Sequence, residues 1–234
     1  MKYKTLIKKL RLGDEDFKTI KNAVAEAEAK TTGEIAVAVA PESARYCFWE
    51  LLAADFFSAL VLVCMLPFSD KILALYRRLY WQNEPSWILP LFFIISCLSA
   101  VVIAFYIANI PVVDRLVIPP SVRRTCVTNR AFRYFTESGV YDTAEHSGIL
   151  IFVSYMERQV RIVADSGISK YISQDMWNLI ADELAENLRK GQAAAAFTTA
   201  IEKCGELLAE YFPPHEENPN ELPDGLVILE DAEW

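Results

Sequence analysis

The sequence predicts a membrane-anchored α/β domain, and three features indicate it. Residues 87–108 (WILPLFFIISCLSAVVIAFYIA) are apolar, and no charged residue occurs between Glu84 and Asp114. At about 1.5 Å per residue, a helix of this length reaches roughly 33 Å, which is enough to cross the hydrocarbon core of a membrane. Strand-like apolar runs and amphipathic helical patterns lie on both sides of this stretch. We expect five of its aromatic side chains to anchor the helix in the bilayer: Trp87, Phe92, Phe93, Phe105 and Tyr106.

The composition is that of a single domain core with apolar residues left for a membrane segment, since 53% of the 234 residues are hydrophobic. The formal net charge is −8, but residues 213–234 hold seven acids and neither Lys nor Arg. The remaining 24 acids and 23 bases nearly balance. The acidity therefore belongs to the tail, and no basic region is dense enough to predict a nucleic-acid partner.

Five scattered cysteines (Cys47, Cys64, Cys97, Cys126 and Cys204) form no C-x-x-C pair. Their odd number and their spacing predict free thiols in a reducing compartment. The basic N-terminus is not followed by an apolar run, so we expect no cleavable export signal.

The first part of the domain is predicted as a helix followed by a buried strand. Asp14 is a plausible N-cap of a helix over 14–30, because acids fill its first turn and apolar residues recur at helical spacing. Residues 34–40 (EIAVAVA) form an apolar run that stops at Pro41, which is typical of a strand covered on both faces.

The second part is predicted to follow the apolar stretch. After a short strand over 115–118, we expect a helix over 121–138 that ends before Gly139. Residues 149–155 and 160–164 then read as an antiparallel hairpin, and helical periodicity predicts helices over 174–189 and 193–211.

Two terminal segments lie outside this pattern. Residues 1–13 are basic with one apolar face, and they either lie on an anionic membrane surface or form a frayed end. The acidic tail, 213–234, contains several prolines around the apolar residues 226–229, and we expect it to pack locally or to stay mobile.

A second apolar run, residues 48–68, is long enough to span a membrane but carries Glu50 and Asp55. An acid costs about 2.5–3.5 kcal/mol at the centre of a bilayer and much less near its surface. Both acids lie toward the start of the run. We therefore expect Asp55 to be an interfacial acid, with a buried functional acid as the alternative.

Three motifs give the chain a family resemblance. They are T-x-G-E-I-x-V-x-V at 31–39, G-I-L-I-F-V-S at 148–154, and E-R-x-V-R-I-V-A-D-x-G-I at 157–168. In this order they resemble the TPM-domain family, and the ending N-E-L-P-D at 220–224 is similar to that of its membrane-anchored members. The resemblance implies an α/β sandwich: a small mixed sheet flanked by helices, formed here by residues 14–47 and 112–212.

If the strand at 34–40 and the hairpin at 149–164 share one sheet, both lie on the same side of the membrane. The number of crossings between them must then be even. The interpretation is therefore a two-helix transmembrane hairpin over 48–111 that interrupts the domain. The connector between the two helices, residues 69–86, holds three basic residues (Lys71, Arg77 and Arg78). The flanks hold six (Lys30, Arg45, Arg115, Arg123, Arg124 and Arg130), so we expect the domain to face the cytoplasm.

Relatives described as metal-binding or phosphatase-active carry a D-x-D-x-D-N-G run before the second conserved strand. Here residues 142–148 read DTAEHSG, in which Asp142 alone keeps a carboxylate in register. We therefore expect no cofactor, although a divalent cation (calcium or magnesium) could still use Asp142, Glu145 and Asp165 as metal ligands. The alternative for each acid, and for Glu34, is a solvated or helix-capping role. His146 has no identifiable partner in the sequence, which also contains none of the common catalytic signatures.

These observations favour an integral protein of the cell or inner membrane. Its partners would be the lipid bilayer and other membrane proteins, for which the TPM-like domain would act as an interaction or regulatory module without catalysis. The alternative hypothesis is a weak metal-dependent acid phosphatase.

Overall fold

The computed structural model describes residues 3–80, 85–108, 110–143, 145–214 and 222–230. The chain divides into two compact units. Unit 1 comprises residues 1–45 and 121–234, and unit 2 comprises residues 46–120.

Unit 1 contains a four-stranded mixed sheet with the strand order β3-β2-β1-β4. Its strands are β1 (Glu34–Ala40), β2 (Gly148–Ser154), β3 (Gln159–Ala164) and β4 (Leu226–Ile228). Strands β1 and β2 are parallel and pair from Glu34 with Gly148 to Ala40 with Ser154. Strands β2 and β3 form the antiparallel hairpin. The predicted strand at 34–40 and the predicted hairpin are thus confirmed, and they share one sheet.

The helices of unit 1 also follow the predicted pattern. They are α1 (Tyr3–Leu10), α2 (Asp14–Glu28), α7 (Pro120–Glu137), α8 (Gln174–Arg189) and α9 (Ala193–Tyr211), with a short 3-10 turn at Ile168–Lys170. The sequence predicted α2, α7, α8 and α9 to within two residues at each end.

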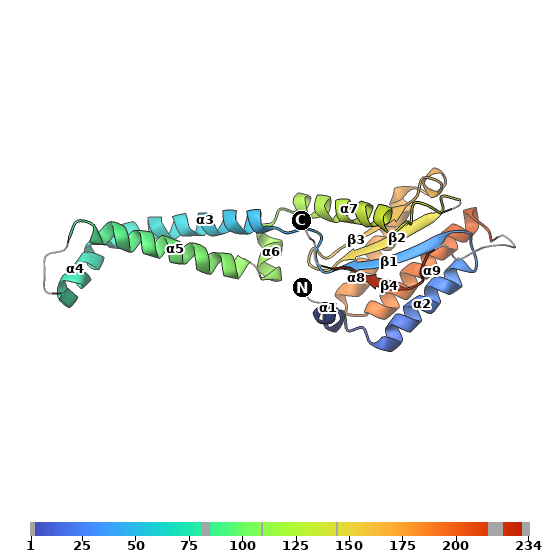
Figure 1. Ribbon diagram of the computed structural model, residues 1–234, viewed down its shortest axis with the longest axis horizontal. Helices are drawn as coiled ribbons and strands as arrows, with labels where there is room; N and C mark the ends of the chain where they lie inside the picture. Colours follow the sequence, from blue (N-terminus) through green and yellow to red (C-terminus); the bar gives the residue numbers. More distant parts are fainter. Residues whose placement is uncertain (1–2, 81–84, 109, 144, 215–221, 231–234) are drawn as a thin grey trace. The chain divides into compact units, whose positions relative to one another are not determined.

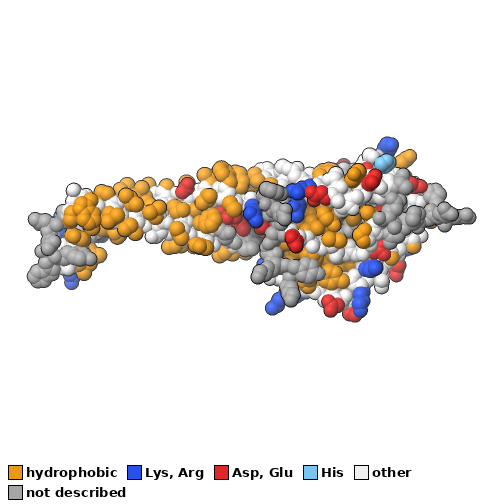
Figure 2. Space-filling model, viewed as in Figure 1, with side chains coloured by type: hydrophobic (Ala, Val, Ile, Leu, Met, Phe, Trp, Pro, Cys, Tyr) orange, Lys and Arg blue, Asp and Glu red, His pale blue; other side chains and the backbone are white. Residues whose placement is uncertain are grey.

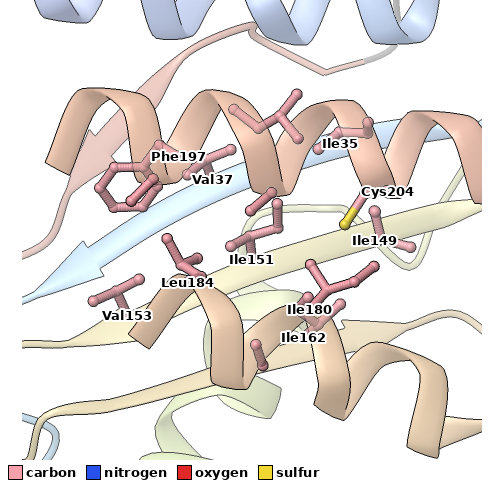
Figure 3. Close-up of a cluster of buried hydrophobic side chains, with 14 of the residues drawn as sticks. Ile35, Val37, Ile149, Ile151, Val153, Ile162, Ile180, Leu184, Phe197 and Cys204 are labelled. Carbon is pink, nitrogen blue, oxygen red and sulfur yellow. The ribbon is translucent and has the colours of Figure 1, made fainter. Parts of the chain in front are cut away.

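Both faces of the sheet are covered by helices. Alternate residues of each strand point to opposite faces, so each strand contributes side chains to both layers. Helices α2, α8 and α9 lie on one face, and α7 lies on the other (Figure 1). On the first face, Val37 of β1 and Ile151 of β2 belong to the same buried cluster as Phe197 of α9 (Figure 3). On the second face, small side chains such as Ala38 pack with Ala131 of α7.

The basic N-terminal segment is part of this core. Leu6, Leu10 and Leu12 are buried and belong to the cluster beneath α8 and α9. The expectation of a surface-bound or frayed segment is therefore wrong. Its apolar face covers other apolar residues of unit 1, because removing them from water stabilises the fold.

The end of the chain supplies a strand that the sequence analysis did not predict. Strand β4 pairs in parallel with β1, from Val37 opposite Leu226 to Val39 opposite Ile228. The Leu229 N–H then donates to the Val39 carbonyl oxygen at 2.8 Å. The apolar residues of the tail thus extend the sheet at its β1 edge.

Unit 2 is a helical hairpin. Helix α3 (Cys47–Met65) continues through a 3-10 turn at Leu66–Phe68 into α4 (Ser69–Tyr80), and α5 (Ile88–Ala108) packs along α3. Two segments, Cys47–Leu79 and Ile88–Ala108, are long and apolar enough to cross a membrane.

The strand expected at 115–118 is wrong, because residues Pro111–Val117 form the short helix α6. Proline fits the first turn of a helix, where its missing N–H would have no intrahelical partner. The helix ends at Ile118, which is extended (φ −81°, ψ 123°) as expected before Pro119.

The hairpin of unit 2 buries small side chains and exposes large ones. Ala54 and Ser58 of α3 and Ala100 of α5 are buried, whereas Phe56 is 74% exposed and Leu98 is 63% exposed. The Ser58 hydroxyl donates to the Cys97 carbonyl oxygen at 3.1 Å, which joins the two helices. Hydrophobic side chains cover α3 and α5 in Figure 2. A helix pair in water would show the opposite arrangement.

Candidate functional site

The polar side chains singled out in the sequence gather near the start of β1 and β2. The loop before β1 carries Thr32, and the loop before β2 carries Ser147. The Ser147 hydroxyl donates to the Thr32 carbonyl oxygen at 2.9 Å, and the Glu34 N–H donates to the Ser147 carbonyl oxygen at 3.3 Å. These buried contacts join the two loops into one edge of the sheet.

Glu145 is part of the same network. Its Oε2 accepts a hydrogen bond of 2.6 Å from the Thr32 hydroxyl. Two residues further on, the Ser147 N–H donates to Thr143 Oγ1 at 3.0 Å. The Glu145 carboxylate therefore helps to fix the loop before β1, which is a structural role for an acid named as a possible metal ligand.

His146 has a partner that the sequence analysis missed. Its Nδ1 lies 3.3 Å from Oδ2 of Asp165, whose side chain is 10% exposed while that of His146 is 62% exposed. The hairpin register could have indicated this pair. Ala164 lies opposite Ile149, so the residue after β3 stands beside the start of β2, and the Asp165 N–H donates to the Gly148 carbonyl oxygen at 2.9 Å.

The loop after β3 lies tightly against this site. A Cβ on Gly167 would stand 2.4 Å from the carbonyl oxygen of His146, so only glycine allows the approach. His146 itself has a positive φ of 53°. A carboxylate beside an imidazole can orient it as a base, and this is the arrangement nearest to catalytic chemistry at this edge.

The three acids named as possible metal ligands do not form a cluster of oxygen ligands. The Asp142 side chain is exposed. The backbone N–H of Asp142 donates to the Gly139 carbonyl oxygen at 2.9 Å, which closes a turn. Glu145 is bonded to Thr32, and Asp165 accepts from the Ser166 N–H. Across the described residues, no three His, Cys, Asp or Glu side chains are grouped to hold a metal ion. Calcium takes six to eight oxygen ligands, so this loop does not fit such a site.

A second acidic group, which the sequence analysis did not single out apart from Glu34, lies between α2 and β4. Glu28 is buried at the end of α2, and its Oε1 accepts from the Ile35 N–H at 2.8 Å. Glu34 Oε2 accepts from the Leu222 N–H at 3.2 Å. The pKa of Glu28 is raised to about 8, mainly by burial; the Ile35 N–H opposes this shift, and the nearby acids Glu34 and Asp224 add to it. A protonated Glu28 can then share its proton with the Asp224 carboxylate.

A buried serine and glutamate network lies at the other ends of β1 and β2. Ser154 Oγ donates to Glu157 Oε2 at 2.6 Å and lies 2.7 Å from Ser43 Oγ, while the Ser43 N–H donates to Glu157 Oε1 at 2.8 Å. Both Glu157 oxygens are thus used to hold the chain after β1 against the hairpin turn. This network is structural.

In unit 2, the side chain of Asp55 is exposed on the surface of the hairpin, and its place at the membrane interface stays a prediction. Two other acids of unit 2 are buried: Glu50 is 6% exposed and Asp114 is 8% exposed. Of the predicted anchoring aromatics, Trp87, Phe92 and Tyr106 are exposed, and Phe93 and Phe105 are half-buried. All five cysteines are free, as predicted, and burial raises the pKa of the Cys204 thiol well above its ordinary value.

The chain is similar to a known domain family over part of its length and to a solved structure. The model of the TPM domain matches residues 114–207, a range that contains the second and third motifs and most of unit 1 after the hairpin. No curated protein matches the sequence. A solved structure, the NMR structure of the BA42 protein from the psychrophilic bacterium Bizionia argentinensis, is similar with a TM-score of 0.53 and 19% identity. The similarity covers 93% of this chain and 94% of that one, and at this identity it shows the fold alone.

Proposed function

From the premise that this chain carries a TPM domain, we propose that it is a membrane-anchored interaction or regulatory module for other membrane proteins. Unit 2 would cross the bilayer twice as a hairpin, and unit 1 would act on partners beside the membrane. The proposal needs no cofactor and no catalysis.

The observation that carries the proposal is the arrangement of side chains in unit 2. Lipid tails are as apolar as leucine, so membrane helices associate through small residues and polar contacts while large apolar residues face outward. Ala54, Ser58 and Ala100 lie at the buried positions, and Phe56 and Leu98 lie outside. In water, this exposed apolar surface would promote aggregation.

The sheet of unit 1 supports two crossings and not one. Because β1 and β2 are adjacent parallel strands, the chain segments that enter and leave unit 2 belong to one folded body. A single crossing would place them on opposite sides of the bilayer. The larger number of basic residues in the flanks than in the connector favours a cytoplasmic position for unit 1.

The hydrogen bonds at the sheet edge support a non-catalytic role. Glu145 accepts a hydrogen bond from the Thr32 hydroxyl, and Asp165 accepts one from the Ser166 N–H. Both bonds hold the loops in place. The His146 and Asp165 pair is the one feature that favours the second candidate, a weak acid phosphatase. The two candidate functions predict different phosphatase activities for the purified protein.

One experiment separates the two functions. The full chain would be purified in mild detergent and assayed for hydrolysis of p-nitrophenyl phosphate with and without calcium or magnesium, beside Asp142→Ala and Asp165→Asn variants. If the chain is a non-catalytic module, the unchanged protein should hydrolyse the substrate no faster than the two variants. Neither cation should then change its thermal stability. Hydrolysis that needs Asp142 and a divalent cation would contradict it.

The interaction role has its own test. The full chain and a chain in which an unrelated transmembrane hairpin replaces residues 46–120 would each be used to isolate associated membrane proteins. The proposal predicts that the same protein is retained by both, because unit 1 recognises it. If nothing associates with either chain, the role as a module is wrong.

A further inference from the structure

A basic cleft lies in unit 1 at the end of the sheet opposite the acidic loops. Its volume is about 320 Å³, which is within the usual range for small-molecule sites. Five of its lining residues are cationic: Lys9, Arg11, Arg158, Arg189 and Lys190. None of its described lining residues is Asp or Glu. This is unexpected in a chain whose 31 acids outnumber its 23 Lys and Arg residues.

Three separate parts of the chain bring these charges together. Lys9 and Arg11 come from the end of α1, Arg158 from the β2–β3 turn, and the remaining two from the end of α8. Gly191 lies against Arg11, since a Cβ at position 191 would stand 3.8 Å from Arg11 Nη1. Lys9 Nζ lies 5.7 Å from the centre of the Tyr155 ring.

The backbone at two of the arginines departs from what their side chains prefer. Arg11 has φ 57° and Arg158 has φ 53°, in the left-handed region where glycine is the usual residue. The third non-glycine residue with positive φ among those described is His146. Arginine at both positions keeps a guanidinium at the cleft despite a conformational cost, which indicates a use for the charge.

The protein neutralises this charge only in part. Lys190 pairs with Glu186 at 2.9 Å. For Arg11, Arg158 and Arg189, the structure gives no ion pair within 4.0 Å among the described residues. The helix dipole accounts for cations at the end of α8, but Arg158 lies on a hairpin turn where no helix end stabilises it.

We propose that this cleft binds a phosphate ester. The planar guanidinium presents paired donors that match phosphate oxygens, and several such groups around a dianion offset their mutual repulsion. The cleft also has apolar lining residues, including Leu10, Val160 and Leu188, which suit a small organic group on the phosphate. The ester is either a soluble phosphate monoester or the headgroup of an anionic lipid.

The test uses phenyl phosphate as the probe and the full chain in phosphatidylcholine nanodiscs. We expect saturable binding, weakened about ten-fold by either Arg11→Gly or Arg158→Gly, since a charge-assisted hydrogen bond is worth this much. Glycine suits the left-handed backbone, so neither variant should lower the thermal stability of the unliganded protein. Arg124→Gln, on the opposite face of the sheet, is the matched control and should leave binding unchanged.

A second set of nanodiscs containing phosphatidic acid distinguishes the two sources. Unchanged phenyl phosphate binding supports a soluble ligand, and loss of binding supports a lipid headgroup that occupies the cleft. Phenyl phosphate binding that does not saturate, or that both glycine variants retain at full affinity, would overturn the proposal. So would an equal loss of affinity in the Arg124→Gln control.

Discussion

Val37 and Ile151 are partners in adjacent parallel strands, although all of unit 2 lies between them in the chain. Both side chains belong to the core cluster beneath α8 and α9. The hairpin is therefore an insertion into a domain that closes on itself, and the sheet cannot form until the chain has left unit 2. This relationship fixes the parity of membrane crossings in the proposed topology.

The packing of the hairpin in unit 2 predicts that an Ala-to-Leu substitution lowers stability at a buried position and not at an exposed one. Ala54→Leu would add three carbons at a position that is 1% exposed against α5, and overpacking of this kind costs about 1–3 kcal/mol. Ala74→Leu, on the exposed side of α4, is the matched control and should change stability little. Unfolding in mixed micelles with increasing SDS measures both. Equal midpoints for the two variants would mean that α3 and α5 do not pack through this face.

Glu28 predicts a loss of stability as the pH rises. Its pKa is about 8 in the folded protein and near 4.5 when unperturbed, so the folded state holds the proton more tightly. The contribution to stability is complete below 4.5 and is lost as the pH rises through 8, by at most about 1.4 kcal/mol per pH unit. Glu28→Gln keeps an acceptor for the Ile35 N–H and does not titrate.

As the pH rises from 4.5 to 8, we therefore expect the unchanged protein to lose stability relative to Glu28→Gln. The free energy of unfolding of the variant should increase relative to that of the unchanged protein over this range. Urea unfolding of both proteins in the same detergent gives the difference directly and cancels the titration of other groups. Parallel pH profiles would show that Glu28 is ionised in the folded state.

The close contact between α2 and α9 at Gly205 predicts that substitutions at Gly205 and Ala27 have non-additive effects on stability. A Cβ on Gly205 would stand 2.7 Å from the Cβ of Ala27, which is too close for two carbons. Gly205→Ala should therefore destabilise unit 1 by roughly 1–3 kcal/mol, despite the better helix propensity of alanine. In the Gly205→Ala background, Ala27→Gly should recover much of the loss. A double-mutant cycle by thermal unfolding measures this coupling, and additive effects would contradict the close contact.

The fold was largely predictable because its signals are local. The apolar run at 34–40 and the hairpin at 149–164 have the length and turn residues of strands, and α2, α8 and α9 have clear helical periodicity. Strand β4 was not predictable, because three apolar residues in an acidic tail become a strand only by pairing with β1. The same holds for α1, whose apolar face gave no sign that it would cover the core of unit 1.

The polar sites were less predictable, since they depend on residues far apart in the sequence. The partner of His146 follows from the register of a hairpin, and the raised pKa of Glu28 follows from its burial beside Glu34 and Asp224. The basic cleft combines α1, a hairpin turn and the end of α8, which no motif connects. Such groupings require the tertiary structure.

The two-crossing topology is the central claim, and thiol accessibility tests it most directly. In a chain without native cysteines, single cysteines would be placed by Lys21→Cys and Lys170→Cys in unit 1 and by Asp70→Cys in the connector, all at exposed positions. An impermeant thiol reagent added to intact cells should label the Asp70→Cys protein and leave the other two unlabelled until the membrane is opened. Labelling of Lys21→Cys or Lys170→Cys but not both would contradict the account, because the sheet that joins β1 and β2 cannot lie on two sides of a membrane.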